Sequence, residues 1–282
     1  MLYGFILILT AIFFGIYRAY KNTHLFALNR IKINSPEIET NHSINILHIS
    51  DLHLENLSVT PEKLYKSLKD ESIDLIALTG DFLDRKRSIP KLPQYLEVFQ
   101  RLNPTHGIYA VFGNHDYVLK DRNFQELEEM LNRYNCTTLR NENMSIEIEG
   151  KLINIIGIDN YGTGHSDLEQ AYKHLPASGF NLVLTHDPNV VLDMDDSPFD
   201  YLLSGHFHGG QIHWPKPYHL IKMGKLVHLQ MVKGLHHIKG KPFYISEGLG
   251  QTGFNIRVGS RPEITIHEVN LNVSEGKDHV AS

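Results

Sequence analysis

The chain has 282 residues, a length that fits one large domain or two small ones. Hydrophobic residues make up 41% and charged residues 21%, which excludes a disordered protein, and the net charge of -5 excludes a general nucleic-acid binder. The single cysteine, Cys136, excludes an intramolecular disulfide and a thiolate metal cluster. Because imidazole is the commonest metal ligand, the 18 histidines are the first residues to inspect.

Residues 1–17 form an uncharged apolar run that predicts a membrane helix. At about 1.5 Å per residue, the run approaches the roughly 30 Å hydrocarbon core. No basic residue precedes it and no small-residue cleavage site follows, which favours an uncleaved single-pass anchor over a signal peptide or a buried helix. The positive-inside bias of Arg18, Lys21, Arg30 and Lys32 predicts that the rest of the chain lies on the cytoplasmic side. Residues 18–43 are expected to be a linker that can include an edge strand.

From about Asn45 onward, short apolar runs alternate with helical patterns, which is typical of βαβ units in an α/β fold. The expected strands are INILHIS, DLIALTG, IYAVFG, NLVLTH and YLLSG. Helices are expected at 61–72 with Thr60 as N-cap, at 121–134 and at 167–175. The segment MSIEIEGKLINIIGID alternates around a Glu-Gly turn and predicts an antiparallel hairpin, so the sheet should be mixed. One globular domain is expected at 44–273, followed by a polar tail at 274–282.

Each of the five expected strands is followed by a residue that can bind a metal. These residues are Asp51 and His53, Asp81, Asn114, His186, and the pair His206 and His208. Open α/β sheets bind ligands beyond the carboxyl ends of their strands, so five such ends predict one shared site. A lone histidine at a strand end is more often a satisfied polar residue, but five coincidences among oxygen and imidazole donors favour a metal centre.

Five motifs follow one another along the chain: D-L-H at 51–53, G-D-F-L-D at 80–84, G-N-H-D at 113–116, T-H at 185–186 and G-H-F-H-G-G-Q at 205–211. In this combination and order they resemble the calcineurin-like metallophosphoesterases. G-L-G at 248–250 and R-P-E at 261–263 are similar to the end of the family's membrane-associated bacterial branch. The resemblance implies a four-layer α/β/β/α sandwich with mixed sheets that carries two divalent metals.

The resemblance also implies which residues hold the metals. One metal would take Asp51, His53 and His208, the other Asn114, His186 and His206, and Asp81 would bridge the two. Two divalent cations, two carboxylates and a bridging hydroxide leave the centre net positive, which suits a phosphoryl group and explains an amide at Asn114. Such mixed donor sets accept manganese, iron, zinc or cobalt, of which manganese is expected.

By the same resemblance, the bridging hydroxide attacks phosphorus in line. His115 would protonate the leaving oxygen and Asp84 would orient His115, against the alternative of a solvated loop histidine. Arg85, Arg257 and Arg261 are candidates for phosphate contact, with a plain surface role as the alternative for each.

The stretch between Asp200 and Glu247 contains six lysines and Trp214 but no acidic residue, which predicts either a basic flap beside the metals or a solvated hairpin face. Together with the anchor, it favours a lipid-linked phosphate at the membrane, of the UDP-diacylglucosamine type that the resembled branch hydrolyses in lipid A synthesis. The alternatives are a phosphodiesterase or nuclease acting on nucleotides and a non-catalytic metal-binding scaffold. The anchor and the negative charge argue against a nuclease, and the complete ligand set argues against a scaffold.

Overall fold

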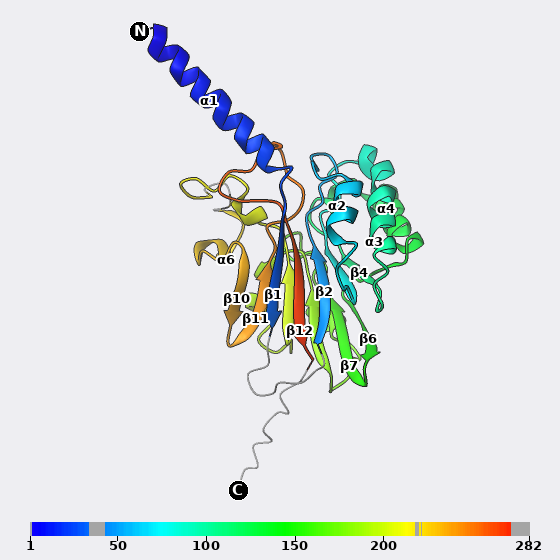
Figure 1. Ribbon diagram of the computed structural model, residues 1–282. Coiled ribbons are helices and arrows are strands. Elements are labelled where there is room, and N and C mark those ends of the chain that lie inside the picture. Colours follow the sequence, from blue (N-terminus) through cyan, green and yellow to red (C-terminus); the bar gives the residue numbers. More distant parts are fainter. Residues whose placement is uncertain (1, 34–42, 218–219, 221, 272–282) are drawn as a thin grey trace.

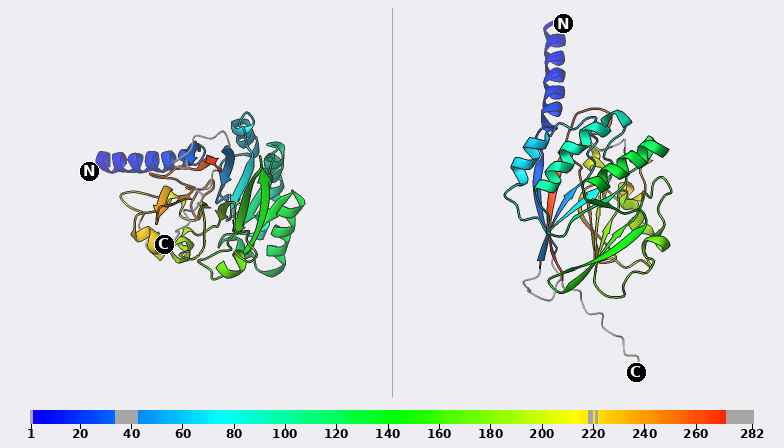
Figure 2. Two further views of the ribbon diagram at one scale, coloured as in Figure 1. Left: turned by 90° about the horizontal axis from the view of Figure 1, so that it is seen from below. Right: turned by 90° about the vertical axis from the view of Figure 1, so that its right-hand side faces the viewer.

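The computed structural model describes residues 2–33, 43–217, 220 and 222–271. Two six-stranded mixed sheets pack against each other, with helices on their outer faces (Figures 1 and 2). This arrangement confirms the predicted α/β/β/α sandwich. The predicted tail at 274–282 and part of the predicted linker, 34–42, lie outside the described residues.

The first sheet has the order β1-β12-β2-β3-β4-β5. Its strands are β1 Ala27–Ile33, β12 Glu263–Asn270, β2 Ser43–Ile49, β3 Leu75–Thr79, β4 Ile108–Val111 and β5 Cys136–Thr138. β12 is antiparallel to β2, whereas β2, β3, β4 and β5 are mutually parallel. The carboxyl ends of these parallel strands therefore lie at one edge of the sheet.

The second sheet has the order β10-β11-β9-β8-β7-β6. Its strands are β10 Gly234–Ile238, β11 Lys241–Ile245, β9 Tyr201–Ser204, β8 Phe180–Leu184, β7 Lys151–Gly157 and β6 Glu142–Ile148. β6 and β7 form the predicted antiparallel hairpin, with Ile148 opposite Lys151 at its turn. β7, β8, β9 and β11 are parallel, so their carboxyl ends also share one edge.

Apolar side chains from both sheets form the central layer of the sandwich. Ile46 and Leu75 of the first sheet lie in the same buried cluster as Leu182 and Leu203 of the second. The neighbouring residue Leu47 faces the other way, into a cluster with the covering helices. Because both faces of β2 and β3 are covered, their sequences are nearly continuous apolar runs.

The helices are α1 Leu2–Asn22, α2 Pro61–Leu68, α3 Leu92–Arg101, α4 Asp121–Arg133, α5 Leu168–Ala171 and α6 Lys225–His228. Short 3-10 helices cover Lys86–Lys91, Asp116–Leu119, Pro188–Asp193 and His208–Gly210. α2, α3 and α4 cover the outer face of the first sheet (Figure 1). The second sheet is covered by α5, α6 and the 3-10 helix Pro188–Asp193.

Two predicted helices are shorter in the structure, and a third helix was not predicted. α2 ends at Leu68 instead of Ser72, because the residues after Leu68 are polar and bury no apolar contact. The helix predicted at 167–175 is reduced to the single turn α5, which buries only Ala171. α3 was not predicted, although its buried residues repeat at helical spacing, as in Leu92, Leu96 and Phe99.

α1 is longer than the predicted anchor and continues past Tyr17 to Asn22. It is long and apolar enough to cross a membrane, with a mean hydropathy of 1.8. The helix projects away from the sandwich, and only its last turn contacts the body (Figures 1 and 2). There the backbone N–H of Arg257 donates to the carbonyl of Ala19 at 2.9 Å, and Asn22 Nδ2 donates to the carbonyl of Arg257 at 3.0 Å.

The N-cap of α2 gives a stability prediction. Thr60 is extended, and its Oγ1 accepts a hydrogen bond from the backbone N–H of Lys63 at 3.2 Å. We expect Thr60→Ala to lower the free energy of unfolding by about 1 kcal/mol, because the first turn loses this acceptor. Urea unfolding followed by circular dichroism measures the change. Thr60→Asp keeps an acceptor and serves as the control, and equal losses in both variants would contradict the capping role.

Candidate metal centre

The seven predicted ligands follow the carboxyl ends of five strands, but these strands belong to two sheets. β2, β3 and β4 carry three of the ends in the first sheet, whereas β8 and β9 carry two in the second. The predicted shared site is therefore formed by the edges of two sheets and not by the edge of one. Asp51 links the sheets, because both of its carboxylate oxygens accept from the backbone N–H of His206 at 3.2 Å.

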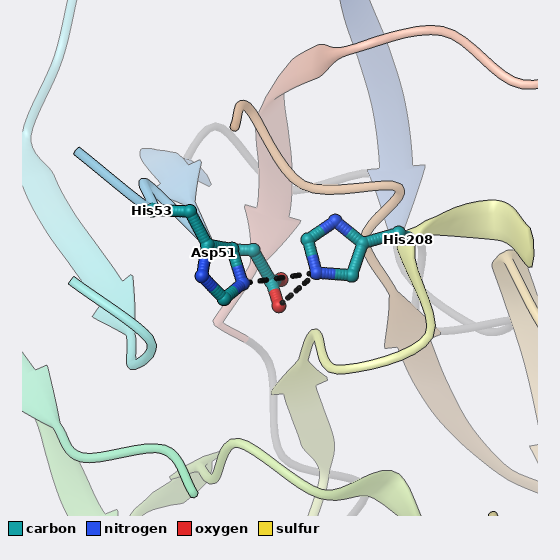
Figure 3. A group of neighbouring side chains, drawn as sticks. All are labelled: Asp51, His53 and His208. Atoms are coloured by element: carbon teal, nitrogen blue, oxygen red, sulfur yellow. Dashed lines mark hydrogen bonds and ion pairs between the residues drawn. The ribbon is translucent and has the colours of Figure 1, made fainter. Parts of the chain in front are cut away.

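Asp51, His53 and His208 form one compact group of donor atoms (Figure 3). The two imidazole Nε2 atoms of His53 and His208 are 3.1 Å apart, and His208 Nε2 is 3.3 Å from Asp51 Oδ1. All three side chains are buried. Each of these atoms therefore has a neighbour with a lone pair, an arrangement that a shared cation stabilises.

Asp81, His186 and His206 form a second group, and Asp81 reaches toward both groups. Asp81 Oδ2 is 3.1 Å from His186 Nε2 and 3.5 Å from His53 Nε2 in the first group. His186 Nε2 is also 3.1 Å from His206 Nδ1. The other oxygen of Asp81, Oδ1, accepts the backbone N–H of His115 at 2.8 Å. The carboxylate is thus held between two sets of imidazoles.

Asn114 stands beside the second group. Its Oδ1 is buried and has no hydrogen-bond partner among the described residues. An unpaired buried carbonyl oxygen is costly, so this atom is suited to a ligand that the chain itself does not supply. Asn114 and His206 also line one side of a pocket of about 680 Å³.

The backbone at the ligand positions is strained. Asp51, His53, Asp81, His206 and His208 all have positive φ, between 37° and 77°. Side chains at positive φ cost of the order of 1 to 3 kcal/mol each and occur mainly where the surrounding structure enforces them for function. Five such residues converge on one cluster, which marks it as a functional site.

Glycines let the backbone approach the two carboxylates. A Cβ at Gly113 would overlap the carboxylate of Asp81, and a Cβ at Gly205 would overlap the side chains of Ser50 and Asp51. The glycines that begin the G-N-H-D and G-H-F-H motifs are therefore required by the close packing of these loops against the Asp81 and Asp51 loops, independently of any ligand.

The buried groups around Asp81 shift one another's pKa values in opposite directions. Burial raises the pKa of Asp81, but the charge and hydrogen bond of His186 outweigh it and hold the pKa well below its ordinary value. Burial lowers the pKa of His208 well below its ordinary value, with further lowering by the charges of His53 and Arg257. Burial and the charge of His186 also lower the pKa of His206. Burial lowers the pKa of His186, but the charge and hydrogen bond of Asp81 raise it to about 10. His206 and His208 are therefore neutral, as metal ligands must be, whereas a cation would displace the proton that His186 shares with Asp81.

These donors fit two divalent cations. Imidazole nitrogens, carboxylate oxygens and one amide oxygen are the donors that manganese, iron, zinc and cobalt accept, and neither of the two described donor groups contains a cysteine. The two donor groups meet at Asp81, which is the position that a bridging carboxylate needs.

Asp84 joins His115 to the cluster. Asp84 Oδ1 lies 2.6 Å from His53 Nδ1 and 3.1 Å from His115 Nδ1. Burial lowers the pKa of His115, but the hydrogen bond of Asp84 and the charges of Asp81 and Asp84 raise it to about 9. Asp84 therefore fixes both rings through Nδ1 and leaves their Nε2 atoms directed elsewhere.

Asp116 and Glu55 support the loops from behind. The carboxylate of Asp116 accepts the backbone N–H groups of Asp81, Phe82 and Gly113 at 2.9 Å, so it bonds a second loop as well as its own. Burial and the charge of Asp81 raise its pKa to about 7. Glu55, which the sequence did not suggest, accepts the backbone N–H of Asp84 at 2.9 Å. The only sequence feature that could have indicated this role is the position of Glu55, two residues after the ligand His53.

The three arginines fall into two classes. Arg85 and Arg261 are exposed, and their contact with phosphate stays a prediction. Arg257 does not fit this role, because it is fully buried and its guanidinium donates to the carbonyls of His208 at 2.7 Å and of Gly250 at 2.7 Å. A buried guanidinium finds its acceptors within the protein, so Arg257 supports the His208 loop from behind.

The lysines between Asp200 and Glu247 were predicted to form either a basic flap beside the metals or a solvated surface, and the structure shows some of each. Lys222 and Lys225 line the pocket beside Asn114 and His206. Lys239, in contrast, forms an ion pair with Asp195 in which both side chains are more than 60% exposed. Part of the stretch therefore faces the site, and part forms ordinary surface contacts.

Comparison with known proteins agrees with this geometry. Residues 44–210 match the profile of the calcineurin-like phosphoesterase family. The uncharacterised metallophosphoesterase YkoQ of Bacillus subtilis is 60% identical over 255 residues, which cover 90% of this chain and 94% of YkoQ.

Two more distant relatives have more specific names. The UDP-2,3-diacylglucosamine pyrophosphatase LpxG of Chlamydia trachomatis is 27% identical, covering 86% of this chain and 89% of LpxG. The phosphodiesterase YaeI of Escherichia coli is 28% identical, covering 79% of this chain and 81% of YaeI. With more than half of its length matched by the family profile, the chain belongs to the calcineurin-like phosphoesterases and is a phosphoester hydrolase.

Proposed function

We propose that the protein is a membrane-anchored phosphohydrolase with two metals that cleaves a phosphoester or pyrophosphate bond of a lipid-linked substrate. The observation that carries the proposal is the position of Asp81, within 3.5 Å of imidazole nitrogens from both donor groups. A second candidate, hydrolysis of soluble phosphodiesters, is favoured by the similarity to YaeI and is separated by the substrate test below.

Seven side chains would hold the cations. Asp51, His53 and His208 serve the first, Asn114, His186 and His206 the second, and Asp81 both. When bound, two divalent cations supply an acidified water and the positive charge that stabilises phosphoryl oxygens. Asp84 keeps the His53 ring in place through Nδ1, and the carbonyl of Thr79 does the same for His186 at 2.7 Å from its Nδ1.

His115 is the proposed proton donor to the leaving oxygen. Its ring is partly exposed, with 30% of the side chain accessible, whereas the ligand histidines of the first group are buried. Asp84 accepts from Nδ1, so Nε2 carries the proton that can be transferred. Asp84 is a positioning residue, because it acts through His115 and His53.

A lipid-linked substrate is supported by three features. α1 has the length and hydropathy of a membrane anchor, and the basic residues Arg18 and Lys21 at its end favour a cytoplasmic domain. Lys222 and Lys225 give the pocket beside Asn114 a positive side, which suits a phosphate or pyrophosphate group. The relative LpxG is named for a lipid-linked pyrophosphate.

The substrate class is tested with the full chain in detergent micelles supplied with manganese. We expect UDP-2,3-diacylglucosamine or another lipid-linked phosphodiester to be hydrolysed with a higher kcat/KM than soluble nucleotides. Release of the headgroup product, followed by chromatography, measures both. Faster hydrolysis of soluble nucleotides would contradict the lipid assignment and support the second candidate.

Asp81→Asn should remove activity without unfolding the protein. The amide keeps the shape of the side chain but loses the charge that offsets two cations, so activity should fall by more than about 100-fold and bound metal should decrease. Hydrolysis of a p-nitrophenyl phosphodiester and elemental analysis of the purified protein measure the two effects. Asp70→Asn is the matched control, since this side chain is 82% exposed. Full activity in Asp81→Asn would overturn the bridging assignment.

His115→Gln should lower kcat by about 10²- to 10⁴-fold for a substrate with a poor leaving group. For a p-nitrophenyl ester the loss should be much smaller, because p-nitrophenolate leaves without a proton. Comparison of kcat for an alkyl ester and the p-nitrophenyl ester measures the difference. Equal losses for both esters would show that His115 acts on binding or structure and not as the acid.

A further inference from the structure

We propose that the metal-bearing edge of the sandwich faces the lipid bilayer, and that Trp214 and Phe254, on two loops beside the inner end of α1, enter its headgroup region. The inference rests on the proposed anchoring by α1. It adds a second, independent contact that would fix the orientation of the catalytic domain at the membrane.

Strand directions place the end of α1 and the metal centre at the same edge. β1 begins at Ala27, five residues after the last residue of α1, and pairs in parallel with β12, which begins at Glu263. β12 is antiparallel to β2, so the beginning of β1 lies at the edge where β2 ends. Asp51 and His53 follow that end of β2. α1 projects from this end of the domain (Figure 1), so a bilayer that contains α1 would lie on the metal-bearing side.

Hydrogen bonds connect this end of α1 to the ligand loops. Arg257 bonds Ala19 of α1 through its backbone N–H at 2.9 Å, while its guanidinium bonds the carbonyl of His208 at 2.7 Å. Thr23 Oγ1 lies 2.7 Å from Ser58 Oγ, on the loop that follows His53. The end of α1 and the residue after it are thus bonded to the body at several points, which restricts rotation of the domain about the helix.

Two exposed aromatic side chains lie on loops joined to the same point. Trp214 is 77% exposed and Phe254 is 78% exposed. Gln211 Nε2 donates to the carbonyl of Phe254 at 3.0 Å, and the backbone N–H of His213 donates to the carbonyl of Val258 at 2.7 Å. The Phe254 and Trp214 loops are therefore bonded to each other and, through Arg257, to the end of α1.

A bilayer surface fits the chemistry of this patch better than a protein partner. Aromatic rings at the level of the headgroups flank membrane helices, and basic side chains beside them meet anionic phosphates. Arg18 and Lys21 occupy the last turns of α1, and Lys216 follows Trp214 by two residues; all three are exposed. The patch is also continuous with α1, whose apolar side chains are exposed almost throughout.

Trp214 is the only tryptophan of the chain, so its fluorescence reports on this loop alone. The full chain is reconstituted into vesicles of phosphatidylethanolamine and phosphatidylglycerol, with or without bromine near the headgroup end of the acyl chains. We expect bromine to reduce the Trp214 emission relative to vesicles without bromine. Phe254→Trp in a Trp214→Phe background should be reduced in the same way.

Two matched variants in the Trp214→Phe background make the result decisive. Phe13→Trp reports on insertion of α1, and Lys151→Trp lies at the β6–β7 turn, at the opposite edge of the sandwich. Bromine quenching of Phe13→Trp together with a Trp214 signal as weakly quenched as that of Lys151→Trp overturns the inference but leaves the anchor intact. Absence of quenching in Phe13→Trp overturns both the anchor and the inference.

Emission of Trp214 that changes with protein concentration but not with bromine identifies a second copy of the chain as the occupant and also overturns the inference. Catalytic activity does not enter this test, so failure of the proposed substrate is distinguishable.

Discussion

The site depends on one carboxylate held between two sets of imidazoles. Asp81 ends β3 in the first sheet, yet its Oδ2 lies 3.1 Å from His186, which follows β8 in the second. A buried ionised carboxylate is unfavourable unless positive charge or hydrogen bonds surround it. The two sheets therefore meet at an electrostatic contact as well as at their apolar faces, and two cations at this point would join them further.

Three further charged side chains hold the backbone of the loops that carry the donors. Asp116 binds the backbone of the Asp81 loop, Glu55 binds that of the Asp84 loop, and Arg257 binds that of the His208 loop. None of these three side chains belongs to the two donor groups around Asp81. Each fixes a main chain that displays a donor, which explains how short loops hold side chains at positions that they would not adopt alone.

The sequence predicted the parts of the fold that have a local signal. The alternating pattern at 142–157 and the Thr60-Pro61 start of α2 were read correctly, because turn residues and caps act over a few residues. The sequence did not show which of the five strands belongs to which sheet, since strand pairing is a long-range property. The support by Glu55 and the burial of Arg257 were missed for a similar reason: exposure and backbone contacts depend on loops about 30 and 49 residues away.

The positive φ angles at Asp51, His53, Asp81, His206 and His208 limit how the site can be redesigned. Asn, Asp and His are the non-glycine residues that adopt this conformation most readily, whereas β-branched and bulky residues are strongly disfavoured. The backbone thus restricts the side chains that can be exchanged here before any metal is considered. A change of metal preference by new donor types would require the loops to be rebuilt, so variation of the enzyme's chemistry is more accessible in the pocket walls than in the donors.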